Sequence, residues 1–518
     1  MGLQERITGI FRPGPAYRPP TRDPAEERRL TGSLLENLVE LRAMFGASMD
    51  LVVHEVKVCG IPCAVALCEG MVDTNVWSKM FAQPLVELAL EGPTPQKLLA
   101  WLRTGSLLAP DQKEVRTFGD LFRFMMSGFV VLLVDGVDLA EVFGIQGFAG
   151  RSVEEPAGES NMRGSREGFV ERLRPNFSLV RRRLKTPDLI FEMVTLGTKS
   201  RTDGALVYLK DTVSPELLRQ IRQRLARVQM DVVLETGYLQ PFLERRPLSL
   251  FSGVGVTERP DTLCAKVAEG RVGLLLDGTP YALVMPYLFG ENFQSLDDYS
   301  HRPYFATLIR WLKYGSFLLT VLLPGLYVAV GSFHPELLPP TLLMDLVVSQ
   351  ETTPFPLALE ALFTFFIYEI VREAGLRMPR SVGHAVSIVG GLVIGDAAVS
   401  AGLIGAPMVI VVAITAISAF VAPALYEPVT VLRFAFLLTG GLLGVFGVTL
   451  GFCAVVVNLC AVNPFGVPAA SPAAPLSPYA LRDVGVRWGW RLLSRQDLRV
   501  QDLAGSDLRS EGGTADGN

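Results

Sequence analysis

The sequence predicts a two-part protein, in which an α/β cytoplasmic tandem of two related subdomains is followed by an all-α multi-span membrane domain. Two observations lead to this fold class. The candidate membrane spans all lie after residue 313, and three sequence blocks recur in order within the first 300 residues. Charged residues make up only 19% of the chain and its mean hydropathy is +0.33, which favours a protein that lies partly in lipid.

The length of 518 residues is enough for several domains, and we divide the chain into five parts. They are an N-terminal extension (1–29), a first cytoplasmic subdomain (30–160), a second cytoplasmic subdomain (161–300), a transmembrane helical domain (301–465) and a C-terminal tail (466–518). The N-terminal residues lack the apolar run of a secretory signal. We therefore expect the first 300 residues to remain in a reducing cytosol.

The evidence for a tandem is internal similarity at a nearly constant spacing. The paired blocks are DLVVHEVKV (50–58) with DLIFEMVTL (188–196), AVALCEG (64–70) with ALVYLKD (205–211), and GFVVLLVDG (128–136) with GRVGLLLDG (270–278). A helix-like segment precedes the first block of each unit. Each unit closes on an Asp-Gly step between β-rich runs, which predicts a tight turn with positive φ at the glycine.

Five apolar segments are candidate membrane spans. They are 314–333, 355–371, 385–404, 406–426 and 434–462. The second span is short and carries two glutamates, so it is either a crossing or an interfacial or re-entrant element. Arginines and lysines flank the spans in a positive-inside pattern that places residues 1–300 in the cytoplasm. The arginines of the tail favour the same side, whereas five spans would place them outside, and the sequence leaves this conflict open.

Catalytic and metal-binding patterns are absent from the sequence. It contains no P-loop, nucleophile elbow or dinucleotide fingerprint, and only four histidines. The spacing of Cys59, Cys63 and Cys68 favours buried thiols over a metal site. With 48 Lys and Arg against 52 Asp and Glu, the net charge of −4 gives no overall basic field that would attract nucleic acid. We expect a protein that is not an enzyme and needs no cofactor.

One stretch, residues 163–185, is strongly basic. It holds eight Arg and Lys but only two glutamates. Three interpretations remain open: a solvated face with acidic contacts from a neighbouring subunit, binding to anionic lipid headgroups, or binding to nucleotide or nucleic-acid phosphate. We select five residues as candidates for subunit or membrane-surface contact: Arg163, Arg166, Arg181, Arg182 and Arg183.

At this stretch the chain resembles a known family. Residues 151–211, from RSVEEPAGES to GALVYLKD, are similar to the characteristic segment of the A subunit of spore germinant receptors, the GerA family. Further similarity to that family lies in YFATLIRWLKYGSFLLTVLLPGLYVAVGSFHPELLP (304–339), in 354–411 and in FGVPAASPAAP (465–475). The resemblance therefore covers nearly the whole chain beyond residue 30.

The resemblance implies a non-enzymatic membrane subunit in the spore inner membrane. It would act with a transporter-like B subunit and a lipoprotein C subunit, and would form a homo-oligomer that conducts ions when nutrients are sensed. Two alternatives remain. One is a paralogue of the stage V sporulation AF type acting as an accessory germination channel, and the other is a membrane-tethered signalling or binding subunit without conduction.

Within the helical domain, small residues recur every four positions and predict a helix-packing seam. These residues are Gly383, Ser387, Gly391 and Gly395. Glycines at 440, 444, 447 and 451 repeat this theme in the last span.

Two acids, Glu360 and Asp396, are the candidates for an ion pathway, because a carboxylate at lipid depth must face protein or water. The alternative for Asp396 is a structural acid between helices. Glu369 falls on the opposite side of its helix from Glu360, and we expect it to form an interfacial salt bridge.

Overall fold

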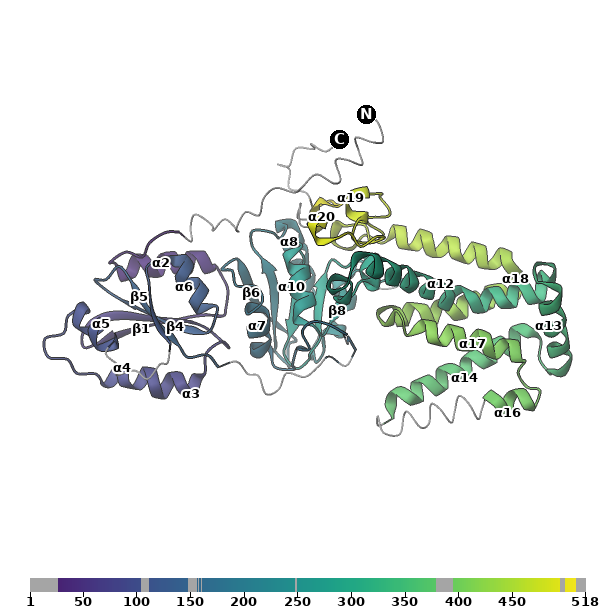
Figure 1. The fold of residues 1–518 in the computed structure, drawn as a ribbon, viewed down its shortest axis with the longest axis horizontal. Coiled ribbons are helices and arrows are strands. Elements are labelled where there is room, and N and C mark those ends of the chain that lie inside the picture. Colours follow the sequence, from purple (N-terminus) through teal and green to yellow (C-terminus); the bar gives the residue numbers. More distant parts are fainter. Residues whose placement is uncertain are drawn as a thin grey trace, which may run out of the picture.

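The computed structural model describes residues 27–508 except 104–110, 148–155, 157, 160, 247–248, 379–394 and 494–498. Two five-stranded sheets follow one another and lead into a bundle of apolar helices (Figure 1). The first sheet lies at one end of the elongated molecule, the second in the middle and the helices at the other end. This arrangement confirms the predicted class of α/β units followed by a helical region.

The first subdomain is an antiparallel sheet in the order β1-β2-β4-β5-β3. Its strands are β1 (Leu51–Val58), β2 (Ile61–Cys68), β3 (Gln112–Val115), β4 (Phe129–Val134) and β5 (Ala140–Gly144). Helices α2 (Leu34–Phe45) and α6 (Phe118–Met125) pack on one face. The other face is covered by the segment that contains α3 (Thr74–Val76), a π-helix η1 (Trp77–Ala82), α4 (Gln83–Glu87) and α5 (Pro95–Arg103).

The second subdomain repeats this strand order as β6-β7-β9-β10-β8. Its strands are β6 (Leu189–Leu196), β7 (Thr202–Leu209), β8 (Gly255–Thr257), β9 (Val272–Leu276) and β10 (Ala282–Met285). Helices α7 (Leu173–Arg181) and α10 (Pro260–Ala268) cover one face. The opposite face carries α8 (Pro215–Leu225), η3 (Thr236–Tyr238) and α9 (Gln240–Leu243). The equal order of the two sheets agrees with the internal similarity of the sequence.

The same polar contact closes both subdomains. Asp135 Oδ1 accepts a hydrogen bond of 3.0 Å from the Leu34 N–H, the first residue of α2. Asp277 Oδ1 accepts one of 2.9 Å from the Leu173 N–H, the first residue of α7. Each aspartate is followed by a glycine with positive φ, as the Asp-Gly steps predict. The aspartate of each Asp-Gly step thus accepts a hydrogen bond from the first N–H group of a helix. That N–H group has no partner within the helix itself.

The C-terminal tail is built into the second subdomain. Its elements are η8 (Pro464–Gly466), α19 (Pro478–Leu481), α20 (Trp490–Leu493) and η9 (Val500–Asp502). Phe465, Val467, Val500 and Leu503 are buried in the same core as α8 and the sheet. In Figure 1 the yellow tail lies over this subdomain, at the base of the helices.

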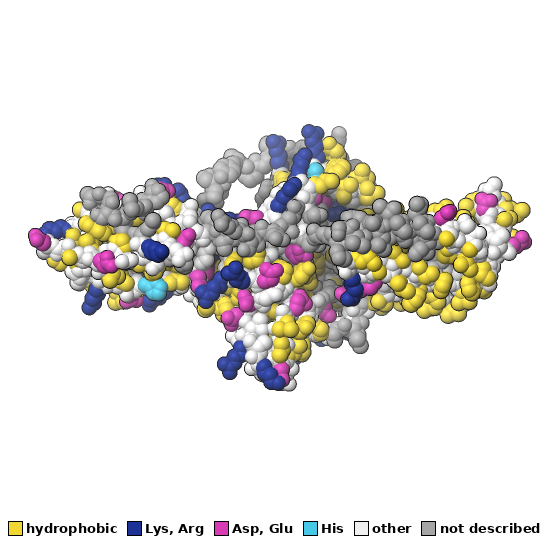
Figure 2. Space-filling model, turned by 90° about the horizontal axis from the view of Figure 1, so that it is seen from below, with side chains coloured by type: hydrophobic (Ala, Val, Ile, Leu, Met, Phe, Trp, Pro, Cys, Tyr) yellow, Lys and Arg dark blue, Asp and Glu magenta, His cyan; other side chains and the backbone are white. Residues whose placement is uncertain are grey.

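The helical domain begins after η4 (Phe289–Phe293) and α11 (Asp297–Ser300). Its main helices are α12 (Pro303–Phe333), α13 (Pro340–Thr352), α14 (Leu357–Arg377), α16 (Gly395–Ser400), α17 (Ala406–Ala419) and α18 (Tyr426–Ala461), with short turns η5 (Pro335–Leu337) and η7 (Pro423–Leu425). By length and composition alone, two helices among the described residues, α12 and the run of η7 with α18, are apolar enough to cross a membrane, or three if α13 and α14, bent by 78°, form one span. On the face in Figure 2, hydrophobic side chains cover this part, and charged ones gather over the sheets.

Helix α18 reverses direction at Gly444, whose φ of 63° and ψ of −150° are not helical. A Cβ placed on Gly451 would lie 3.1 Å from the Phe436 ring. In a straight helix, residues fifteen apart would be separated by about 22 Å. The two halves of α18 therefore lie antiparallel to each other. The prediction of one continuous span over 434–462 is wrong, because a glycine in this conformation turns the chain back.

Glycines also set the contact between α12 and the first half of α18. A Cβ on Gly440 has no room beside the backbone of Gly325, and a Cβ on Gly325 has none beside the backbone of Phe436. The two helix backbones are in direct contact, the arrangement that small residues permit in apolar bundles. Helix packing is thus the role of Gly440, as its place in the glycine repeat predicts.

We predict that Gly444→Ala destabilises the helical hairpin by about 1–3 kcal/mol, because only glycine readily adopts this backbone conformation. The measurement is the thermal unfolding of the full chain in detergent. The control is Gly315→Ala, in α12, where an added Cβ meets no atom within 4 Å. Alanine should be neutral or stabilising there. Equal melting of both variants and the parent would contradict a strained reversal.

Candidate functional site

A buried arginine joins the two α/β subdomains. Arg181, the last residue of α7, donates from Nε and Nη2 to the two carboxylate oxygens of Asp50, each at 2.8 Å. Both side chains are 1% exposed. The guanidinium also donates to two backbone carbonyls of its own subdomain and lies near the rings of Phe45 and Phe191. Such a bidentate pair fixes the orientation of one subdomain against the other.

This contact corrects part of the prediction for the basic stretch. Arg181 lies inside the chain, so the prediction that it contacts another subunit or the membrane surface is wrong. Arg182 and Arg183 both bind Glu167, at 2.6 Å each. Arg163 and Arg166 are exposed, and their proposed contact with a subunit or membrane stays a prediction.

A sequence signal for the buried arginine does exist. Leu173, Phe177 and Arg181 are spaced by four, so they form one stripe of α7, and both apolar members are buried. Counting the charges of residues 163–185 does not reveal this stripe, because the count does not indicate which arginine lies on the apolar face of the helix.

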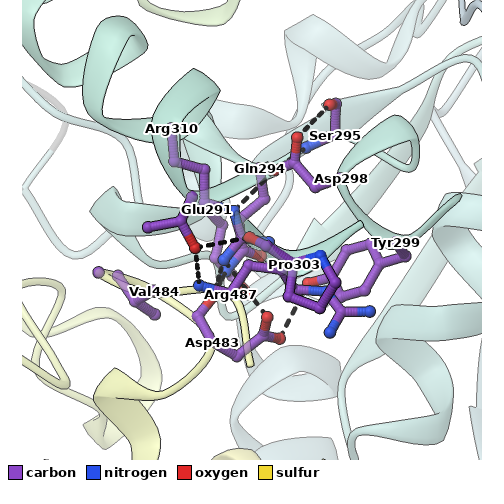
Figure 3. A network of polar contacts seen from close by, with 12 residues as sticks. Glu291, Gln294, Ser295, Asp298, Tyr299, Pro303, Arg310, Asp483, Val484 and Arg487 are labelled. Atoms are coloured by element: carbon purple, nitrogen blue, oxygen red, sulfur yellow. Dashed lines mark hydrogen bonds and ion pairs between the residues drawn. The ribbon is translucent and has the colours of Figure 1, made fainter. Parts of the chain in front are cut away.

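A second buried network fastens the soluble part to the first long helix (Figure 3). Arg310 of α12 is fully buried and donates from Nε to Asp298 Oδ2 at 2.7 Å. Its Nη1 donates to the backbone carbonyl of Asp483 in the tail and lies 3.3 Å from Asp483 Oδ1. The Tyr299 hydroxyl donates to Asp483 Oδ2 at 2.9 Å. One guanidinium thus connects α11, α12 and the tail.

The tail contributes a second buried cation to this network, Arg487. Its guanidinium carbon lies 4.9 Å from the centres of the Tyr299 and Trp490 rings. Its backbone N–H donates to the Thr307 hydroxyl of α12 at 3.0 Å, and the Trp490 indole N–H donates to the Tyr299 carbonyl at 3.1 Å. Aromatic faces are favourable surroundings for a guanidinium. We name the contacts of Asp298, Tyr299, Arg310, Asp483 and Arg487 the junction.

Charges on the sheet side of the junction are closely balanced. Glu291 in η4 accepts from Lys266 Nζ at 2.6 Å and also pairs with Arg271, and Glu269 is the second carboxylate beside these two cations. Burial acts to raise the pKa of Glu291, but Arg271 and Lys266 outweigh burial and hold that pKa below its ordinary value. Burial raises the pKa of Asp483, an effect that Arg310 only partly offsets. Two neighbouring cations therefore stabilise the charged form of Glu291. The charged form of Asp483 is stabilised mainly by Arg310, so it depends on where Arg310 lies.

The two candidate ion-pathway acids lie in different surroundings. Glu360 is 3% exposed, and its Oε1 accepts a hydrogen bond of 2.7 Å from the Gly405 N–H at the start of α17. In the described fold it connects α14 with α17. Asp396, in the first turn of α16, is exposed. The structure does not bring the two acids together in a shared contact, and their part in conduction stays a prediction.

Most of the predicted small-residue seam lies outside the described residues, namely Gly383, Ser387 and Gly391. Gly395 is the first residue of α16, and a Cβ there would meet no atom within 4 Å. No described helix of the same chain therefore packs closely against Gly395. Glu369 makes the salt bridge expected of it, with Arg433 at 2.7 Å.

Sequence reasoning missed the junction altogether. Arg310 counts there only as a flanking positive charge, and Asp483 lies in a tail of undecided position. The one available signal is the cost of burying a charge near an apolar helix, which demands a carboxylate partner without identifying it.

These features define a class of protein, in which a tandem of α/β subdomains is fastened by buried ion pairs to a domain of membrane-type helices. The chain belongs to the family described as Bacillus/Clostridium GerA spore germination protein, which it matches over residues 39–498.

Individual relatives extend over most of the chain. It is 37% identical to spore germination protein KA of Bacillus subtilis (strain 168) over 466 residues, covering 89% of this chain and 85% of that protein. It is 34% identical to the uncharacterized membrane protein YfkQ of the same organism, covering 91% of this chain and 92% of that protein. A solved structure, the N-terminal domain of the A subunit of the Bacillus megaterium spore germinant receptor GerK3, aligns with a TM-score of 0.39 and 27% identity, over 51% of this chain and 98% of that one.

We predict that Arg181→Gln destabilises the soluble tandem by about 3–5 kcal/mol, because Asp50 is then left as an unpaired buried charge. Hydrogen exchange of the full chain in detergent should show faster exchange on both sides of the contact. Arg174→Gln is the matched control, since Arg174 pairs with Glu69 across the same interface but is 70% exposed. Its loss should cost at most about 1 kcal/mol. Similar exchange in the two variants would contradict a central role for Arg181.

We predict that Arg310→Gln loosens the tail, because Asp298 and Asp483 then lack their shared cation. The measurement is the rate of tryptic cleavage after Arg482, Arg487 or Arg491 in the full chain, which should rise. Arg302→Gln, at the exposed start of the same helix, should leave the rate unchanged. Unchanged cleavage in Arg310→Gln would show that the apolar contacts of the tail hold it alone.

Proposed function

We propose that this chain is a membrane subunit of a nutrient germinant receptor in bacterial spores, and that it oligomerises into a nutrient-gated ion channel. The chain is non-catalytic and uses no cofactor. The observation that carries the proposal is the junction, because a buried ionic contact between the soluble tandem and α12 lets a change in one part act on the other. Membership of a family of spore germination proteins supports the biological setting.

The helical domain lies in the spore inner membrane, with residues 1–300 and the tail both in the cytoplasm. The contact between the tail and the second subdomain supports this arrangement, because two parts that share a core lie on one side of any bilayer. The chain between them then crosses an even number of times. The reversal at Gly444 supplies the extra passage that a five-span count lacks. At the far end of α12, the exposed acids Glu336, Asp345 and Glu351 fit an external loop.

The partners of the chain are a transporter-like B subunit, a lipoprotein C subunit and further copies of itself. Support for self-association comes from the apolar side chains that α14 and α18 leave exposed, Phe366, Ile370, Leu442 and Phe446 among them. Such faces are suited to lipid or to another apolar helix.

Asp396 lines the ion path of the oligomer, and Glu360 supports the fold beside it. The exposure of Asp396 and the hydrogen bond of Glu360 to the start of α17 favour this division of roles. A carboxylate that faces water attracts cations. A buried carboxylate that accepts a hydrogen bond from a backbone N–H mainly holds two helices in place.

The test compares Asp396→Asn with Glu360→Gln in spores. Asp396→Asn should leave the amount of assembled receptor normal and lower nutrient-triggered cation release per receptor, because it removes charge without changing shape. Glu360→Gln should lower the amount of receptor, since its hydrogen bond to Gly405 is weakened. Unchanged release per receptor in Asp396→Asn and in the double variant would remove Asp396 from the pathway.

A further inference from the structure

Helices α14 and α18 hold two arginines for one carboxylate. Arg433 Nη1 binds Glu369 Oε1 at 2.7 Å, and Arg372 Nε lies 3.3 Å from Glu369 Oε2. The side chain of Arg433 is fully buried, and those of Arg372 and Glu369 are 13% and 16% exposed. A single carboxylate balances only one guanidinium. The cluster of Arg372, Arg433 and Glu369 therefore carries an excess positive charge inside an apolar domain, where an unbalanced charge is strongly disfavoured.

Unpaired hydrogen-bonding atoms gather around this excess charge. Among the described residues the following buried side-chain atoms near the cluster have no hydrogen-bond partner: Arg372 Nη2, Arg433 Nε and Nη2, the Tyr368 hydroxyl and the Thr430 hydroxyl. Tyr368 follows one face of α14 with Arg372, and Thr430 one face of α18 with Arg433. Every one of these groups can donate a hydrogen bond. The chemistry they share calls for an acceptor with several oxygens and a negative charge.

The cluster opens toward the base of the helical domain. The Arg372 guanidinium lies 3.5 Å from the centre of the Tyr426 ring, and Tyr426 is the first residue of α18. The preceding residue, Leu425, belongs to one buried apolar cluster with Phe251 and Phe293 of the soluble part, and the following residue, Glu427, acts electrostatically on Glu244 of the soluble part. The partly exposed arginine is thus at the end of the bundle that adjoins the sheets, which is the headgroup depth of the cytoplasmic leaflet in the proposed orientation.

We propose that this cluster binds the phosphate group of a phospholipid from the cytoplasmic leaflet. A phosphodiester carries one negative charge, which matches the excess, and its oxygens accept the hydrogen bonds that Arg372 and Arg433 leave unused. Water molecules in the cluster would accept the hydrogen bonds but would not balance the excess positive charge. An acidic side chain of a second copy reaches a buried arginine less readily than a flexible headgroup does.

This inference rests on the proposed membrane location but requires neither conduction nor nutrient sensing. The two can fail separately. A chain that leaves spore membranes in salt or alkaline washes without detergent would refute the membrane location. The lipid experiment below is made on protein that needs detergent for extraction.

The key variant is Arg372→Gln, which leaves a balanced pair of Arg433 and Glu369. The full chain is purified in detergent, washed free of loosely held lipid, and its melting temperature is measured with three probes. These are dioleoyl phosphatidylglycerol, dioleoylglycerol, which lacks the phosphate, and inorganic phosphate. The matched control is Arg377→Gln on the same helix, whose exposed side chain pairs with Glu373 one turn away.

Phosphatidylglycerol should raise the melting temperature of the parent and of Arg377→Gln, and mass spectrometry should find phospholipid retained by both. Dioleoylglycerol and inorganic phosphate should have little effect. Arg372→Gln should lose most of the shift and most of the retained lipid while remaining folded.

Three results would overturn the proposal. Equal phosphatidylglycerol shifts in all three proteins would exclude the cluster as the site. Full protection by inorganic phosphate alone would show that the ligand is a free anion. Loss of the oligomer in Arg372→Gln with lipid retention unchanged would assign the arginine to a carboxylate of a second copy. If Arg372→Gln does not fold, Arg372→Lys replaces it, which keeps the charge but loses the forked hydrogen bonds, and it should show a reduced shift.

Discussion

The burial of Arg310 is the constraint on which the rest of the structure depends. A guanidinium without access to water needs carboxylates close by, and its two partners come from α11 and from the tail. The position of the first long helix is therefore determined together with that of the tail. Once the tail is held there, its apolar residues complete the core of the second subdomain. The membrane-type helices consequently begin and end against the same soluble body.

Buried arginines recur at each boundary between packed units. Arg181 lies between the two α/β subdomains, Arg310 between the soluble part and α12, and Arg433 between α14 and α18. Replacing such pairs by apolar residues is often neutral for stability, so they are better understood as devices that fix geometry. Arg181 is paired with Asp50, and Arg310 has two carboxylate partners, Asp298 and Asp483. The third shares its one carboxylate with Arg372, and this imbalance distinguishes a binding site from a structural clamp.

Glycine has a matching role in the helices. The direct backbone contact of Gly325 with Gly440 holds α12 against α18, and the left-handed conformation of Gly444 turns α18 back on itself. The repeat of small residues predicts close packing, which holds for Gly440. It does not predict the reversal, because a glycine that packs and a glycine that turns look alike in sequence. The backbone conformation of the folded chain, with φ of 63° and ψ of −150° at Gly444, distinguishes the two.

By itself, the sequence determined the α/β class of the first 300 residues, their internal repeat, the Asp-Gly turns and the apolar character of the later helices. These properties follow from local periodicity and composition, which the order of residues states directly. Tertiary structure alone decided that Arg181 faces Asp50, that the tail joins the second subdomain and that Asp483 meets Arg310. The reason is physical, since each of these contacts joins residues more than a hundred positions apart. Burial selects such partners only when the whole chain has folded.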